Sequence, residues 1–211
     1  MCDSYKQSKG EWIIIRKIFY SFLILCLLSA CSHEGITEID ITEDDEVLST
    51  QDVKIPSAIF TSHKQNSVID EEEMRLSIKT YLDSHDELLN ASEPFQDAID
   101  EEKELTKEER EKLDKINKLI KENDENFSGY ILNNTLPEGY LEESKRISRY
   151  IVTVNETLDE LNKMLDDNGD FPEINVGAII KNSKIANGKE QKKIEDFLDE
   201  KKIDTKAFGR E

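Results

Sequence analysis

Cysteine, histidine, proline and tryptophan are scarce in this sequence. Among 211 residues there are three cysteines, three histidines, four prolines and one tryptophan. The last cysteine is Cys31, because Cys2 and Cys26 precede it. Residues 32–211 therefore contain neither an internal disulfide nor a cysteine metal site, which excludes a disulfide-stapled scaffold.

The motifs of common catalytic and cofactor-binding classes are also missing. The chain has no HExxH metal motif, no GxSxG nucleophile motif and no glycine-rich phosphate loop. We therefore expect no catalytic residues, no metal site and no cofactor, and we predict that the protein is not an enzyme.

Positive charge is scarce relative to negative charge. The chain has 28 lysines and arginines against 47 aspartates and glutamates. Residues 1–30 hold four of the cations and two of the anions, so residues 31–211 carry 24 positive and 45 negative charges, a net charge of −21. So acidic a surface is repelled by nucleic acid and by anionic lipid headgroups. We expect no nucleic-acid partner.

One long apolar run occurs, IFYSFLILCLLSA at residues 18–30, directly after Arg16 and Lys17. A basic segment, an apolar run and small residues at its end are typical of a secretory signal. As a helix, thirteen residues reach about 20 Å, short of the roughly 30 Å hydrocarbon core, so we predict a leader rather than a membrane anchor. Including the apolar residues 12–15 gives a longer span, at the cost of placing Arg16 and Lys17 in the membrane.

The end of this run, Leu28-Ser29-Ala30-Cys31, resembles the bacterial lipobox. In such signals the cysteine thiol receives a diacylglyceryl group and the leader is cut just before it. Two acyl chains hold a protein on a membrane almost irreversibly, since each buried methylene contributes about 0.8 kcal/mol. The resemblance implies that residues 1–30 are a lipoprotein signal peptide and that Cys31 anchors the chain to the outer face of a Gram-positive plasma membrane. The alternatives are a signal peptide without lipidation and a buried hydrophobic helix with a chance cysteine.

Residues 31–69 are predicted to form a disordered acidic tether. The segment has an acidic cluster at residues 43–46, scattered serine and threonine, and Pro56. It shows no sustained helical period. Repulsion between like charges is expected to extend it, as in a solvated spacer.

Residues 70–211 carry a helical periodicity. Apolar residues recur every three or four positions, and strand patterns are rare, which predicts an all-α, antiparallel helical bundle of about four helices. The stripes are Met74, Ile78, Tyr81, His85 and Leu88; Leu113, Ile116, Leu119 and Ile120; Ile147, Ile151, Val154, Leu158, Leu161 and Leu165; and a last segment from about Ile174 to Leu198.

Breaks between these helices are predicted from turn and capping residues. Residues 92–94 predict a break with a new helix start at Pro94, and residues 106–109 resemble a capping box. Gly129 and residues 136–139 predict a loop.

Two groups of possible metal ligands have simpler interpretations. His33 and His63 fall in the predicted tether, and His85 lies on an apolar stripe, where we expect a hydrogen-bonded core or boundary histidine. Residues 166–170, DDNGD, resemble the start of a calcium loop, but the twelfth position is Gly177, where an EF-hand requires glutamate. We predict a helix-terminating turn there.

Aromatic residues gather around the region 123–150. They form either a recognition patch or the end of the bundle core, and we favour the core. The residues are Phe127, Tyr130, Tyr140 and Tyr150.

The sequence NDENF at residues 123–127 follows the lipobox by some ninety residues. Together they resemble the NDxxF-motif lipoproteins of Firmicutes, with Asn123, Asp124 and Phe127 as the matching positions. The resemblance implies a membrane-anchored surface protein without an established activity. An Asn-Asp pair near a helix end followed by Phe is typical of a cap whose ring packs into the bundle.

Three functional hypotheses follow. A non-enzymatic binding or adaptor protein for an envelope protein, a peptide or a wall component requires an exposed apolar or aromatic patch. A wall-acting enzyme, or enzyme accessory, with paired carboxylates requires a concave pocket and a carboxyl group of strongly raised pKa. A spacer or cation buffer requires neither. We rank the binding protein first.

Overall fold

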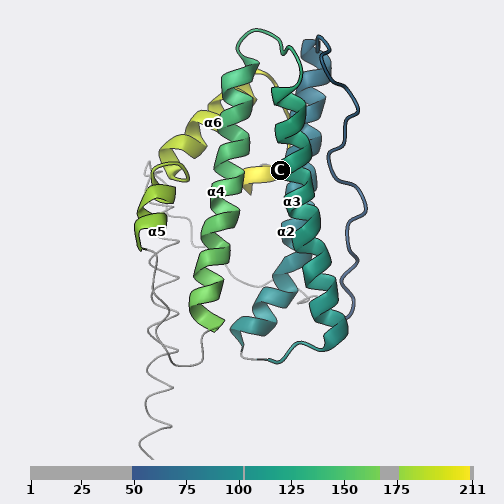
Figure 1. Ribbon diagram of the computed structural model, residues 1–211, viewed down its shortest axis with the longest axis vertical. Helices are drawn as coiled ribbons and strands as arrows, with labels where there is room; N and C mark the ends of the chain where they lie inside the picture. The colour runs from purple at the N-terminus through teal and green to yellow at the C-terminus, as the bar shows by residue number, and fades with distance from the viewer. Residues whose placement is uncertain (1–48, 102, 167–175, 210–211) are drawn as a thin grey trace, which may run out of the picture.

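The computed structural model describes residues 49–101, 103–166 and 176–209 (Figure 1). The regular secondary structure of these residues is helical, apart from an isolated parallel bridge between Val68 and Thr135. None of the helices in these ranges is long and apolar enough to cross a membrane. The helices are α2 (Glu71–Asp100), α3 (Lys107–Leu132), α4 (Tyr140–Asp166), α5 (Val176–Ser183) and α6 (Gly188–Glu200), followed by the 3-10 helix η1 (Ala207–Gly209).

The predicted all-α bundle is confirmed. Helices α2, α3 and α4 run alternately up and down, and α6 covers one side of α4 (Figure 1). These four are the long helices of the described chain, with 30, 26, 27 and 13 residues. The last predicted segment is divided into α5 and α6, because the Asn187 side chain caps a new helix by accepting from the N–H groups of Lys189 and Glu190.

The predicted break at residues 92–94 is wrong, since α2 is continuous from Glu71 to Asp100. Its start is capped by Asp70, which accepts from the N–H of Glu73 at 2.8 Å. Pro94 lies inside the helix and cannot donate to the preceding turn. The helix continues because the next residue, Phe95, is fully buried, and its packing offsets the missing hydrogen bond.

Helix α3 begins as predicted and ends later than predicted. Thr106 and Glu109 form the capping box in both directions. The expected loop at Gly129 is wrong, because the helix continues to Leu132 with Tyr130 and Ile131 buried. The connection to α4 lies at residues 133–139.

The predicted tether extends too far along the chain. Residues 53–69 run beside α3 as an extended segment (Figure 1), and Val53, Phe60 and Ile69 are buried. The intervals between these three residues are seven and nine. Seven residues are two helical turns, but nine are two and a half, and both intervals are odd, so the three residues share no single face of a helix or of a strand and no periodicity indicated the packing. Residues 31–48 of the predicted tether lie outside the described residues.

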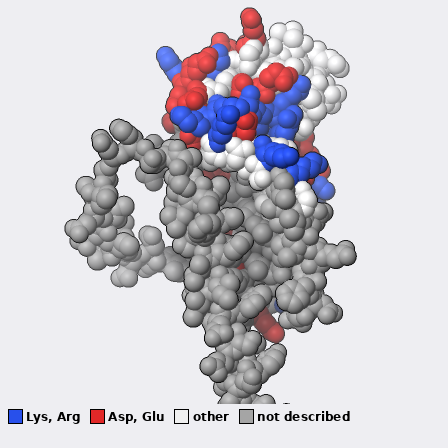
Figure 2. All heavy atoms as spheres, turned by 90° about the vertical axis from the view of Figure 1, so that its left-hand side faces the viewer, with Lys and Arg blue, Asp and Glu red and all other residues white. Residues whose placement is uncertain are grey.

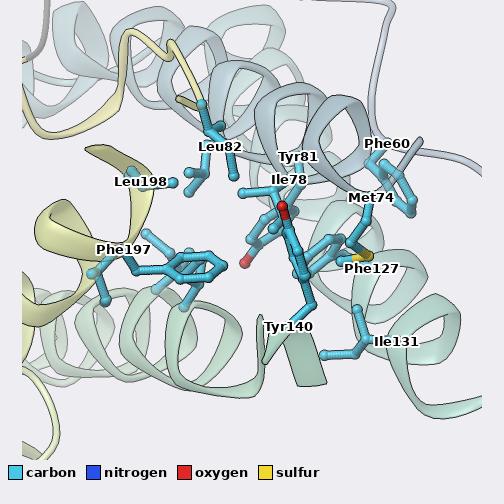
Figure 3. Close-up of a cluster of buried hydrophobic side chains, with 14 of the residues drawn as sticks. Phe60, Met74, Ile78, Tyr81, Leu82, Phe127, Ile131, Tyr140, Phe197 and Leu198 are labelled. Carbon is cyan, nitrogen blue, oxygen red and sulfur yellow. The ribbon is translucent and has the colours of Figure 1, made fainter. Parts of the chain in front are cut away.

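The core has two clusters. The larger one joins α2, α3, α4 and α6 and contains Tyr81, Phe127, Tyr140 and Phe197 (Figure 3). The smaller one contains Val53, Leu88, Phe95, Leu113 and Ile116, from the extended segment, α2 and α3. None of its described members comes from α4.

Candidate functional site

The motif residues Asn123, Asp124 and Phe127 lie within α3 rather than at its end, so the predicted helix cap is wrong. All three side chains are buried. They lie close enough to α2, α4 and the extended segment to contact each of them.

Asn123 connects three parts of the fold. Its Oδ1 accepts from the backbone N–H of Phe60 at 2.8 Å, and its Nδ2 donates to the carbonyl of Tyr81 at 3.1 Å. Asn126 completes the contact by donating to the carbonyl of Phe60 at 3.0 Å. Two asparagines of the motif thus satisfy both backbone groups of Phe60, which fixes the extended segment on α3.

Phe127 packs between two aromatic rings (Figure 3). It stacks on Tyr81, with ring centroids 4.1 Å apart and planes at 3°. Its other neighbour is Phe60, at 5.4 Å and 85°. This edge-to-face contact adds to the burial energy. Phe127 therefore holds the extended segment and α2 together through α3.

Asp124 is a buried carboxylate with neutral partners only. Tyr81 Oη donates to its Oδ1 at 2.7 Å, and Asn155 Nδ2 donates to its Oδ2 at 3.3 Å. Burial raises the pKa of Asp124 to about 6, outweighing the two hydrogen bonds that lower it, and Glu125 raises it further. Among the described lysines and arginines, none forms an ion pair with Asp124.

An open groove of about 1040 Å³ lies beside this carboxylate, between α2, α3 and α4. Asp124 lines it from α3 and Asn155 from α4. The described members of the smaller core cluster come from α2, α3 and the extended segment, and Ile120, which packs against that cluster, also lines the groove. The lining falls between Leu89 and Asp100 on α2, Asn117 and Ser128 on α3, and Ser148 and Leu158 on α4.

Part of the groove wall is apolar, and the rest carries more acidic than basic side chains. Leu89, Ile120, Val152 and Leu158 supply aliphatic surface. The side chain of Leu158 is 45% exposed, which places it at the rim. The acidic residues on the wall are Asp100, Asp124, Glu125 and Glu156, and the basic ones are Lys118 and Lys121.

The face built by α4 and α6 has a different character. Lysines, arginines, aspartates and glutamates are intermingled there (Figure 2). Arg146 pairs with Glu143 at 2.9 Å and with Glu190 at 2.6 Å, and Lys192 pairs with Asp196 at 3.1 Å. The side chains of the two Arg146 pairs are half-buried, whereas the Lys192–Asp196 pair is exposed and contributes at most about 1 kcal/mol to stability. This face therefore presents no field of a single sign.

The remaining candidate residues that the structure describes do not form a binding or metal site. The four aromatic residues Phe127, Tyr130, Tyr140 and Tyr150 are buried, which confirms the core interpretation over a recognition patch. No group of three or more possible metal-ligating side chains occurs in the described ranges. Cys31, the lipobox residues 28–30, His33 and residues 167–170 lie outside those ranges.

The two described histidines, His63 and His85, differ in exposure. His63 is exposed on the extended segment. His85 is 4% exposed, as expected of a core residue, but its Nδ1 has no hydrogen-bond partner in the described part of the chain. Burial lowers the pKa of His85 to about 4, so the imidazole is neutral at physiological pH.

Sequence reasoning missed the partners of Asp124. Tyr81 was predicted as a core residue of its helix, and Asn155 was not singled out. These residues are 43 and 31 positions away from Asp124. A signal was available on α4, where Ser148, Val152 and Asn155 form a mixed stripe beside the apolar one.

Comparison with known proteins gives no family model, no curated protein and no solved structure that matches this chain. The functional argument therefore depends on the residues and geometry described above.

Proposed function

We propose that this protein is a bacterial lipoprotein, anchored through Cys31 to the outer face of the plasma membrane, and that its helical domain is a non-enzymatic binding or adaptor protein. Its partner would be an envelope protein or peptide that binds in the groove between α2, α3 and α4. The observation that carries the proposal is Asp124, a buried carboxylate that lies beside an open groove and forms no ion pair with a described lysine or arginine. Burying an ionised carboxylate lowers the free energy of unfolding, and groups that destabilise the fold in this way occur mainly at functional sites.

The membrane anchor is supported by the lipobox of residues 28–31, which follows an apolar run too short to span a bilayer. The Cys31→Ser variant is expected to lose all incorporation of labelled palmitate and to keep its leader, because serine provides no thiol. Metabolic labelling and mass spectrometry of the N-terminus measure both effects. Cys26→Ser, which removes a cysteine inside the leader, is the matched control and should be processed normally. Continued labelling of Cys31→Ser would overturn the anchor.

The groove is tested in intact cells with a photo-crosslinking amino acid. Placed at Leu158, on the rim of the groove, it should yield discrete adducts with an envelope component. The control position is Leu132, which is 62% exposed on α3 and does not line the groove. Adducts of equal yield and mass at both positions, or no adduct at Leu158, would contradict a binding function for the groove.

A second candidate function is a wall-acting enzyme, because Asp124 combines a raised pKa with a concave setting. Glycoside hydrolysis also needs a second carboxylate roughly 5 to 9.5 Å away. Glu156 and Asp100 line the same groove and are the residues for that role. Release of soluble fragments from purified cell walls by the wild-type protein, and its loss in Asp124→Asn, would favour this function over binding alone.

A further inference from the structure

The groove has the dimensions of one helix. Its lining positions span twelve residues on α2, twelve on α3 and eleven on α4. At a rise of 1.5 Å per residue each stripe is about 16 Å long, or three helical turns. On each helix, lining residues three or four positions apart form a ridge of the kind that packs against another helix.

The groove lies beside the smaller core cluster. In the half of the bundle that contains Phe197, α6 packs on α4 and closes that side. In the other half, the described members of the smaller cluster come from α2, α3 and the extended segment. Ile120 packs against that cluster and also lines the groove, so the apolar wall of the groove continues from the core.

The charges that line the groove indicate which kind of helix could bind in it. Lys118 and Lys121 line it, but they pair along α3 with Glu122 and Glu125, at 3.6 and 3.8 Å. Asp124 on α3 and Glu156 on α4 add negative charge on two different helices. A partner with a cationic side chain opposite Asp124 would supply the counter-charge that the described chain does not provide.

We propose that the groove binds a basic amphipathic helix of about eleven residues from a protein partner. Its apolar face would lie on Leu89, Ile120, Val152 and Leu158, and one lysine or arginine would reach Asp124. This inference rests on the proposed binding function and adds the class of the partner. Helix-in-groove recognition works in this way, with anchors at i, i+3, i+4 and i+7.

The test uses the full chain in phosphatidylcholine nanodiscs and a labelled 14-residue peptide built from leucine and lysine in an amphipathic helical pattern. A peptide of the same pattern with glutamate in place of lysine is the control. Fluorescence anisotropy should show binding of the lysine peptide alone. Asp124→Asn should weaken binding about tenfold, the loss expected for one ion pair of 1.4 kcal/mol. Glu138→Gln, an exposed acid outside the groove, should leave the affinity unchanged.

The binding site is verified with the crosslinking residue at Leu158 and the control at Leu132. Adducts of the lysine peptide at Leu158 alone support the proposal. Equal affinity for both peptides, unchanged affinity of Asp124→Asn, or equal adducts at Leu132 would overturn it. These outcomes leave the proposed function standing if Leu158 still yields adducts with an envelope component in cells, whereas loss of the cellular adducts removes the function itself.

Discussion

Replacing Phe127 with alanine is expected to lower the free energy of unfolding by about 3–5 kcal/mol. The ring is fully buried, stacks on Tyr81 at 4.1 Å and meets Phe60 edge-on at 5.4 Å. Deleting it removes apolar surface from the core and leaves a cavity between three segments. Urea unfolding followed by circular dichroism measures the loss.

The control for this prediction is Phe127→Leu, which keeps most of the volume and should cost less than half as much. Hydrogen exchange adds a local measurement. Residues 53–69 are held on α3 by Phe127 and by the two hydrogen bonds to the backbone of Phe60. Their amides should exchange faster in Phe127→Ala than in Phe127→Leu. A loss below 1 kcal/mol with unchanged exchange would show that the ring does not hold the segment.

The helices of this protein could be predicted from sequence because each one buries a stripe at intervals of three and four. The capping box at Thr106 was equally visible, since all of its partners lie within four residues. Pro94 was misread because local rules assign it to a helix start, whereas the buried Phe95 beside it keeps α2 continuous. Tertiary packing decided that case.

The groove and the docked segment could not be predicted, since both depend on contacts between distant residues. Asn123 meets Phe60 across 63 positions, and Asp124 meets Tyr81 across 43. An amphipathic pattern indicates which face of a helix is buried but not which helix covers it. The groove depends on how α2, α3 and α4 are arranged in space, which has no counterpart in the pattern of one helix.

The pKa of Asp124 gives the second prediction. Asp124→Asn is expected to raise the free energy of unfolding at pH 7.5, by up to about 3 kcal/mol, which corresponds to a pKa raised from 3.8 to about 6. The folded protein favours the protonated carboxyl, so ionisation of Asp124 costs stability as the pH rises from about 4 to about 6. The advantage of the asparagine variant is therefore full above pH 6 and disappears as the pH falls towards 4. Urea unfolding at pH 7.5 and at pH 4 measures the difference.

His85 titrates over the same range with the opposite sign. Its pKa is lowered to about 4, so its contribution is full above the ordinary value of 6.5 and is lost as the pH falls towards 4. The wild-type protein and the Asp124→Asn variant both contain His85, so the difference between their free energies of unfolding isolates the contribution of Asp124. The control is Asp114→Asn, an exposed aspartate on the same helix, which should change stability by less than about 0.5 kcal/mol at either pH.

This experiment also separates a binding role for Asp124 from a structural one. If the carboxylate served the fold through its bonds to Tyr81 and Asn155, the asparagine variant would be less stable at pH 7.5. If the carboxylate serves a cationic partner, the variant gains stability while it loses affinity for the lysine peptide. Opposite changes in stability and binding are what a charge kept for recognition produces, because its desolvation is compensated only in the complex.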